Sequence, residues 1–132
     1  MSRPPAMIQT LIDTHITGFN AQDTDLFVSV FGPTAIIIDG IAPFRWLNPN
    51  AAAHWLADVN KWRETFGVTH EHLDYELGFW TIEGSSAYAV ISATLTMTMH
   101  SHSVVRTGTL AYTFQSRDGA WKIEAQAWGR TS

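Results

Sequence analysis

The spacing of apolar residues changes halfway along this chain. Over residues 4–66 they recur at steps of three and four, the period of helices with one buried face, and one short apolar run at 35–38 interrupts them. Over residues 68–129 they alternate as in strands, and Asp118-Gly119 is a two-residue hairpin signal. Helices followed by a long antiparallel meander predict an α+β domain whose helices cover one face of a curved sheet.

Start and stop signals place the elements more closely. Asp23 or Thr24 is expected to cap a second helix that Gly32-Pro33 ends, and Gly67 is expected to end a third. The turns between the long strands are expected at 83–86, 100–103 and 117–119. The helices are predicted at about 4–19, 24–31 and 49–66, a buried strand at 35–38, and four long strands at roughly 68–82, 87–99, 104–116 and 120–129.

Composition narrows the function classes. The chain suits a single domain over 1–132, and with 45% apolar residues it can form a core although it has no cysteine for disulfides. A net charge of −4 with eight scattered basic residues argues against nucleic acid as a partner. The sequence has no 18-residue apolar run, so neither a membrane span nor a secretion signal is expected. A cytoplasmic protein is therefore predicted. No phosphate-binding glycine loop or dinucleotide fingerprint is present, and no cofactor is expected.

Side chains alternate along a strand, so the last three strands present two faces. The threonine-rich face holds Tyr88, Thr94, Thr96, Thr107, Thr109, Glu124 and Trp128, and the apolar face holds Ile91, Leu95, Met97, Leu110, Tyr112, Phe114 and Ile123. Burial alone favours packing of the apolar face on the helices. Alternatively that face joins two subunits and the threonine-rich face lines a cavity. A single bulge would swap the faces along part of a strand.

The order of elements resembles the nuclear-transport-factor-2-like superfamily, and most of all its SnoaL-like and ketosteroid-isomerase-like branches. The segments that carry the resemblance are Phe19-Asn20-Ala21-Gln22-Asp23, Ala35-Ile36-Ile37-Ile38-Asp39 and Arg117-Asp118-Gly119-Ala120-Trp121-Lys122-Ile123. It implies a cone-shaped α+β barrel, with three N-terminal helices on a strongly curved, mainly antiparallel sheet. It also implies a homodimer through the outer sheet face, which favours the threonine-rich face as the cavity wall.

The resemblance also implies two catalytic residues. Asp39 matches the aspartate that serves as general base in the ketosteroid-isomerase branch, and His15 matches a hydrogen-bond donor on the first helix. The two could instead form a dyad that activates water. A simpler interpretation makes His15 a hydrogen-bonded core residue and Asp39 a turn residue before Gly40.

Other parts of the family's catalytic equipment are matched by alanine, namely at Ala111, Ala125 and Ala127. The predicted function is therefore a pocket for a small apolar molecule, with isomerase or lyase chemistry, or alternatively a non-catalytic binding or dimerisation module. The residues predicted to contact the ligand are Trp46, Trp55, Tyr88, Thr94, Thr109, Glu124 and Trp128. The spacing of His70-x-His72 and His100-x-His102 is also that of metal ligands, but a polar sheet rim is the favoured explanation and no metal is predicted.

Overall fold

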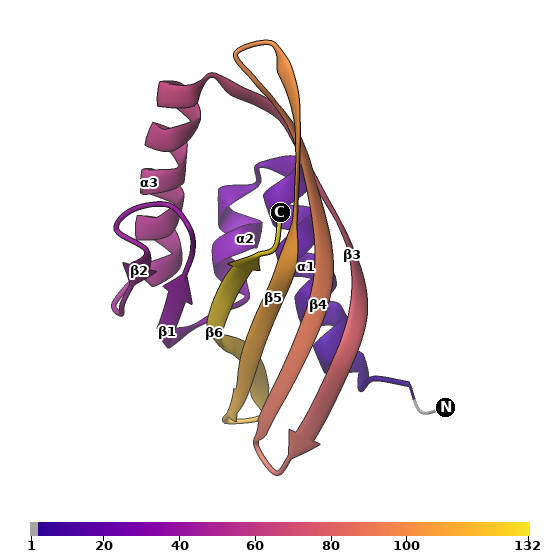
Figure 1. Ribbon diagram of the computed structural model, residues 1–132. Coiled ribbons are helices and arrows are strands. Elements are labelled where there is room, and N and C mark those ends of the chain that lie inside the picture. Colours follow the sequence, from indigo (N-terminus) through magenta and orange to yellow (C-terminus); the bar gives the residue numbers. More distant parts are fainter. Residues whose placement is uncertain (1–2) are drawn as a thin grey trace.

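The computed structural model describes residues 3–132 and contains three helices and one six-stranded sheet (Figure 1). The helices are α1 (Ala6–Ala21), α2 (Thr24–Ser29) and α3 (Ala51–Phe66). The strands are β1 (Phe31–Ile38), β2 (Arg45–Trp46), β3 (Val68–Glu83), β4 (Ser86–Met99), β5 (His102–Arg117) and β6 (Ala120–Arg130). None of the helices in the described residues is both long enough and apolar enough to cross a membrane.

The strands lie in the order β2-β1-β6-β5-β4-β3, and the sheet curls without closing into a barrel. β1 runs parallel to β6, whereas every other neighbouring pair is antiparallel. The last four strands follow one another through two-residue turns, so they pair with their chain neighbours as a meander. The predicted α+β fold, with helices on a curved and mainly antiparallel sheet, is confirmed.

Local signals explain most of the element boundaries. The Asp23 carboxylate caps α2 by accepting a hydrogen bond from the Leu26 amide at 3.1 Å, and Gly67 ends α3 with a φ of 60°. The prediction for Gly32-Pro33 was wrong, because α2 has already ended at Ser29 and both residues belong to β1.

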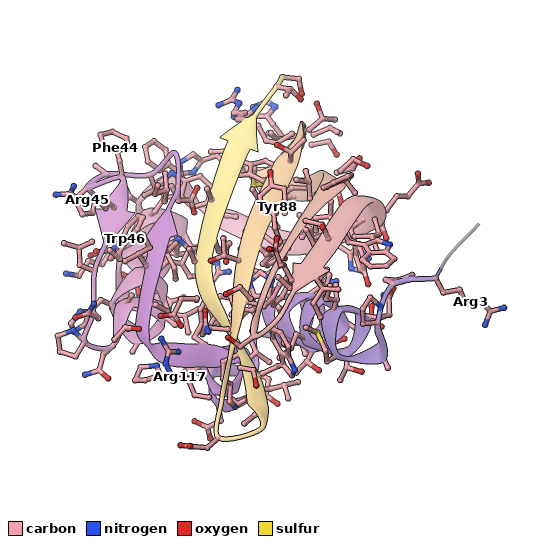
Figure 2. The ribbon with its side chains drawn as sticks, turned by 90° about the horizontal axis from the view of Figure 1, so that it is seen from below. Arg3, Phe44, Arg45, Trp46, Tyr88 and Arg117 are labelled. Carbon is pink, nitrogen blue, oxygen red and sulfur yellow. The ribbon has the colours of Figure 1, made fainter. Side chains whose placement is uncertain are left out.

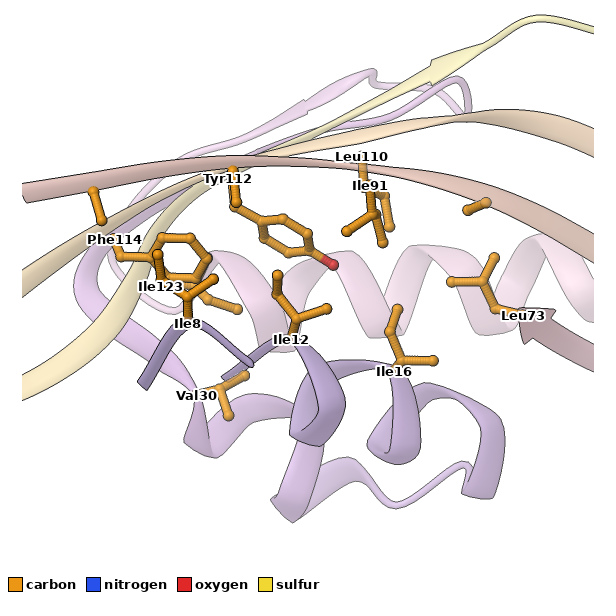
Figure 3. Packing of buried hydrophobic residues seen from close by; sticks show 13 residues of the cluster. Ile8, Ile12, Ile16, Val30, Leu73, Ile91, Leu110, Tyr112, Phe114 and Ile123 are labelled. Atoms are coloured by element: carbon orange, nitrogen blue, oxygen red, sulfur yellow. The ribbon is translucent and has the colours of Figure 1, made fainter. Parts of the chain in front are cut away.

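Buried side chains form two clusters on the concave side of the sheet. The larger one fills the space between α1 and the central strands, and Figure 3 shows the Tyr112 side chain projecting from the sheet toward Ile12 and Ile16 on α1. The smaller one packs α3 against α2 and β1 around Trp55 and Phe27, whose rings stack at a centroid distance of 5.2 Å. Together these clusters hold α1 and α3 apart along the sheet.

A bulge in β6 decides which side chains enter this interior. Ile123 pairs with Phe114, but Ala125 pairs with Thr113, so Glu124 is one extra residue on the β6 side. Beyond the bulge the alternation of β6 is reversed, and Gln126 is the side chain that becomes buried.

Candidate active site

A cavity of about 350 Å³ lies between α1, α3 and the concave face of the sheet. That volume is within the range of sites for small organic molecules. Its wall is mainly apolar, and its charged or polar members are His15, Asp39, Glu71, Arg106, Gln126 and Arg130. The apolar wall comprises Phe19, Ile41, Trp55, Val59, Trp62, Phe66, Leu73, Leu95, Met97, Met99, Leu110 and Trp128. His15 and Asp39, which the sequence places 24 positions apart, therefore border the same space.

Asp39 follows the last residue of β1 and is half-buried at the cavity wall. Its Oδ2 accepts a hydrogen bond from Trp55 Nε1 at 2.7 Å, and its Oδ1 accepts one from the Gly40 amide at 2.6 Å. Burial raises the pKa of Asp39 above its ordinary value, and these two hydrogen bonds oppose that effect. The result is a carboxylate held in a fixed orientation and made more basic than an exposed aspartate.

His15 is 3% exposed and lies among the rings of Phe27, Phe31 and Tyr112. Its Nδ1 is 2.7 Å from the Tyr112 hydroxyl, a buried hydrogen bond between α1 and β5. Burial lowers the pKa of His15 to about 3, and the nearby Gln126 amide opposes this shift only in part. Burial also raises the pKa of Tyr112, so both groups are neutral near pH 7.

Gln126 extends this polar group along the cavity wall. It pairs with Tyr112 across β5 and β6 and is 5% exposed. Its Oε1 has no hydrogen-bond partner of good geometry within residues 3–132. A buried amide oxygen without such a partner is costly, and a donor on a bound molecule would satisfy it.

The structure places the predicted ligand contacts in two groups. Trp55 and Trp128 line the cavity, and their role as ligand contacts stays a prediction. The cavity wall does not include the other five, which are Trp46, Tyr88, Thr94, Thr109 and Glu124. Trp46 is buried outside it and donates from Nε1 to Asp58 at 2.8 Å.

The placement of the threonine-rich face at the cavity was wrong. Leu95, Met97 and Leu110 line the cavity, so the apolar face of β4 and β5 is turned toward the helices and Tyr88, Thr94 and Thr109 point the other way. The physical reason is burial, because this face carries the larger apolar side chains. Glu124 lies in the bulge and pairs instead with Arg117, with Nη1 and Oε2 2.8 Å apart.

Sequence reasoning missed Tyr112 and Gln126 as polar members of the site. Tyr112 belongs to the apolar face by alternation, although the hydroxyl of a buried tyrosine usually finds a hydrogen-bond partner. Strict alternation puts Gln126 on the threonine-rich face with Glu124 and Trp128, and the bulge at Glu124 turns Gln126 and Trp128 to the cavity side. Ala111 and Ala127, two of the alanines at positions where the family has polar residues, pair with each other on the outer face of the sheet. They therefore do not line the cavity.

Glu71, an acidic residue of the cavity wall, belongs to an ion pair. The Arg63 guanidinium on α3 pairs with the Glu71 carboxylate on β3, and their side chains are 13% and 5% exposed. The histidines form no comparable centre. His72 contacts Asp74 at 3.2 Å, and within the described residues no group of three or more His, Asp or Glu side chains is placed to hold a metal ion.

Comparison with known proteins identifies the fold. No protein-family model matches the sequence, and no curated protein matches it either. Among solved structures, a ketosteroid isomerase-like protein from Erwinia carotovora is 14% identical with a TM-score of 0.81, covering 96% of this chain and 95% of that one. A hexachlorocyclohexane dehydrochlorinase from Novosphingobium barchaimii is 16% identical with a TM-score of 0.78, covering 96% and 86%. An NTF2-like protein of unknown function from Pseudomonas putida is 15% identical with a TM-score of 0.69, covering 92% and 82%.

These identities are too low to transfer a function, but the structural match extends over nearly the whole chain. The three helices and the curled six-stranded sheet are the parts of the chain that this match covers. The chain therefore has the nuclear-transport-factor-2-like fold.

Proposed function

We propose that the protein binds a small, mostly apolar molecule in this cavity and moves a proton on it without a cofactor, as an isomerase or a lyase. Asp39 acts as the general base and His15 as a hydrogen-bond donor. The observation that carries the proposal is the Asp39 carboxylate, which is oriented by Trp55 and Gly40 at the wall of an apolar cavity. Asp39 forms no ion pair within residues 3–132, so no neighbouring cation lowers its basicity.

The reaction begins when an Asp39 oxygen removes a proton from a carbon next to an electron-withdrawing group. The electron pair left behind moves onto that group, or expels a leaving group from the adjacent carbon. His15 is suited to meet this negative charge because it is neutral and can still donate one hydrogen bond. If the Tyr112 hydroxyl donates to Nδ1, the imidazole proton is on Nε2, the nitrogen that Tyr112 leaves free.

Two proteins with this fold support the reaction class. One is described as ketosteroid isomerase-like and the other as a dehydrochlorinase. Isomerisation next to a carbonyl and dehydrochlorination can both begin when a base removes a proton from carbon. The position of a basic carboxylate in the cavity is what such a step requires, although the fold alone does not determine the chemistry.

The proposal can be tested without knowing the natural substrate. 5-Nitrobenzisoxazole is a neutral aromatic molecule whose isoxazole ring opens to a coloured phenolate when a base removes the proton on its C3 carbon. We expect the protein to accelerate this opening, and we expect Asp39→Asn to reduce the rate by about a hundredfold or more, as is typical when a positioned general base is lost. Because the pKa of Asp39 is raised, the rate should fall on acidification at a higher pH than an ordinary aspartate would give.

Asp58→Asn is the matched control. Asp58 also accepts a hydrogen bond from a tryptophan, Trp46, but it does not line the cavity, so this variant should keep the parent rate. Equal rates in the parent and in Asp39→Asn would contradict the role of Asp39. A parent protein that binds the probe without accelerating its opening would favour the alternative, a non-catalytic binding module.

We also propose that two copies associate through the outer face of the sheet. This face exposes large apolar side chains, with Phe79, Tyr88 and Val105 at 55%, 39% and 57% exposure. Figure 2 shows Tyr88 projecting from β4. Light scattering during gel filtration should give a mass near twice 14.7 kDa, and Val105→Glu should halve it. A monomeric parent protein would contradict this proposal.

A further inference from the structure

Arg106 on β5 and Arg130 on β6 lie on the cavity side of the sheet, near the C-terminal end of β6. On β5, Arg106 and Leu110 line the cavity, and Gly108 lies between them on the same face of the strand. On β6, Arg130 pairs with Gly108. Arg106 and Arg130 are thus diagonal neighbours on one face of an antiparallel pair, a spacing that long side chains bridge. Both line the cavity.

Gly108, which lies between the two arginines, allows close packing of Trp128 next to the cavity. A Cβ built on Gly108 would lie 2.7 Å from the Trp128 ring and 2.5 Å from the Gly129 carbonyl oxygen. The absence of a side chain at Gly108 therefore lets the Trp128 indole lie against β5. The Trp128 side chain borders the same cavity as Arg106 and Arg130.

Among the described residues of the cavity wall, the basic side chains without an ion pair outnumber the acidic ones. Glu71 is neutralised by Arg63, which leaves Asp39 as the one acidic group of the wall without an ion pair in the described chain. Neither Arg106 nor Arg130 takes part in an ion pair within residues 3–132. Arg130 donates from Nε to the main-chain oxygen of Ser132, the last described residue, at 2.5 Å, which orients its guanidinium and uses only one of its five donors.

We infer that the ligand of this cavity carries a carboxylate, bound by Arg106 and Arg130, at one end of an apolar body that lies over Trp128. This inference names the ligand class of the site and rests on the proposed function only in taking the cavity as a ligand site. Guanidinium groups hold planar carboxylates through paired hydrogen bonds, and an apolar surface beside them strengthens the contact.

The strand register fixes how the ligand is oriented. Gln126, beside His15, lies four residues from Arg130 along β6, and Ile38, next to Asp39, pairs with Ala127. Ala127 lies three residues before Arg130, and three residues of strand span about 10 Å, so the carboxylate is bound toward the end of β6, beyond the point where Asp39 follows β1.

A matched pair of probes tests this inference in the parent protein. 4-Phenylbutyrate and 4-phenylbutanamide have the same apolar body and differ only in the charge at one end. In calorimetric titrations at low salt we expect the acid to bind about tenfold more tightly than the amide, because a charge-assisted contact is lost in the amide. Added salt should narrow this difference.

Single-residue variants then test whether the two arginines cause the preference for the acid. Arg106→Gln and Arg130→Gln should each weaken binding of the acid several-fold and leave binding of the amide within about twofold of the parent. Arg45→Gln removes an exposed arginine that does not line the cavity (Figure 2) and should change neither. Thermal unfolding of each variant checks that it has folded, and Arg130→Lys should recover part of the acid preference.

Three results would overturn the inference. These are equal affinities of the two probes for the parent protein, arginine variants that weaken both probes equally, and a parent protein that binds neither probe. None of them depends on turnover. A protein that prefers the acid but does not open 5-nitrobenzisoxazole would keep this inference and lose the proposed catalysis. A protein that opens it in an Asp39-dependent way without preferring the acid would do the reverse.

Discussion

The burial of His15 predicts that this protein loses stability in mild acid. In the unfolded chain His15 binds a proton near pH 6.5, whereas burial keeps it unprotonated in the folded protein until about pH 3. Lowering the pH between these values therefore adds a proton to the unfolded state first. The free energy of unfolding falls as the pH falls from about 6.5 to about 3.

The size of this loss follows from the two pKa values. At pH 5 an unfolded His15 is mostly protonated and the folded one is not, which lowers the free energy of unfolding by about 2 kcal/mol relative to pH 7. In urea denaturation that shift corresponds to a midpoint lower by about 1 M. The raised pKa of Asp39 acts in the opposite direction, because protonation of Asp39 favours the folded state, so His15 has to be isolated by a variant.

The variant that isolates it is His15→Phe combined with Tyr112→Phe. Replacing both partners leaves neither polar group unsatisfied and keeps aromatic packing against Phe27 and Phe31. Urea midpoints measured for the parent and the double variant at pH 7, 6 and 5 should diverge, with the parent losing about 2 kcal/mol more by pH 5. Parallel losses in the two proteins would refute a neutral, buried His15.

Two further substitutions test the walls of the cavity. Arg63→Ala should lower the free energy of unfolding by about 3 kcal/mol, because it leaves the Glu71 carboxylate buried without its partner; a melting temperature equal to that of the parent would contradict this. Gly108→Ala should displace the Trp128 ring and weaken binding of 4-phenylbutyrate, with a change in tryptophan fluorescence; unchanged fluorescence and affinity would show that the ring has room to move.

The elements of this fold could be predicted because their signals are local. The three-and-four spacing from Met7 to Phe19 marks α1, and the alternation after Val68 together with Asp118-Gly119 marks the meander. The position of Asp39 at the end of β1 and that of His15 on the buried stripe of α1 were likewise readable. A resemblance to a family of known fold then supplied the way these pieces assemble.

The composition of the cavity wall could not be predicted from such local signals. Alternation alone left open which sheet face turns toward the helices, and the structure shows that it is the face that carries Leu95 and Met97. The register of β6 depended on the bulge at Glu124, which strict alternation does not reveal.

The sequence by itself determined the fold class, the order of the elements, and the two residues, His15 and Asp39, that meet at one cavity. The tertiary structure alone brought Tyr112 and Gln126 to His15, and placed Arg106 beside Arg130. The physical reason is that hydrophobic periodicity records how each segment is buried, whereas a site is made by contacts between segments. Those contacts depend on pairing register, which a single extra residue in one strand is enough to change.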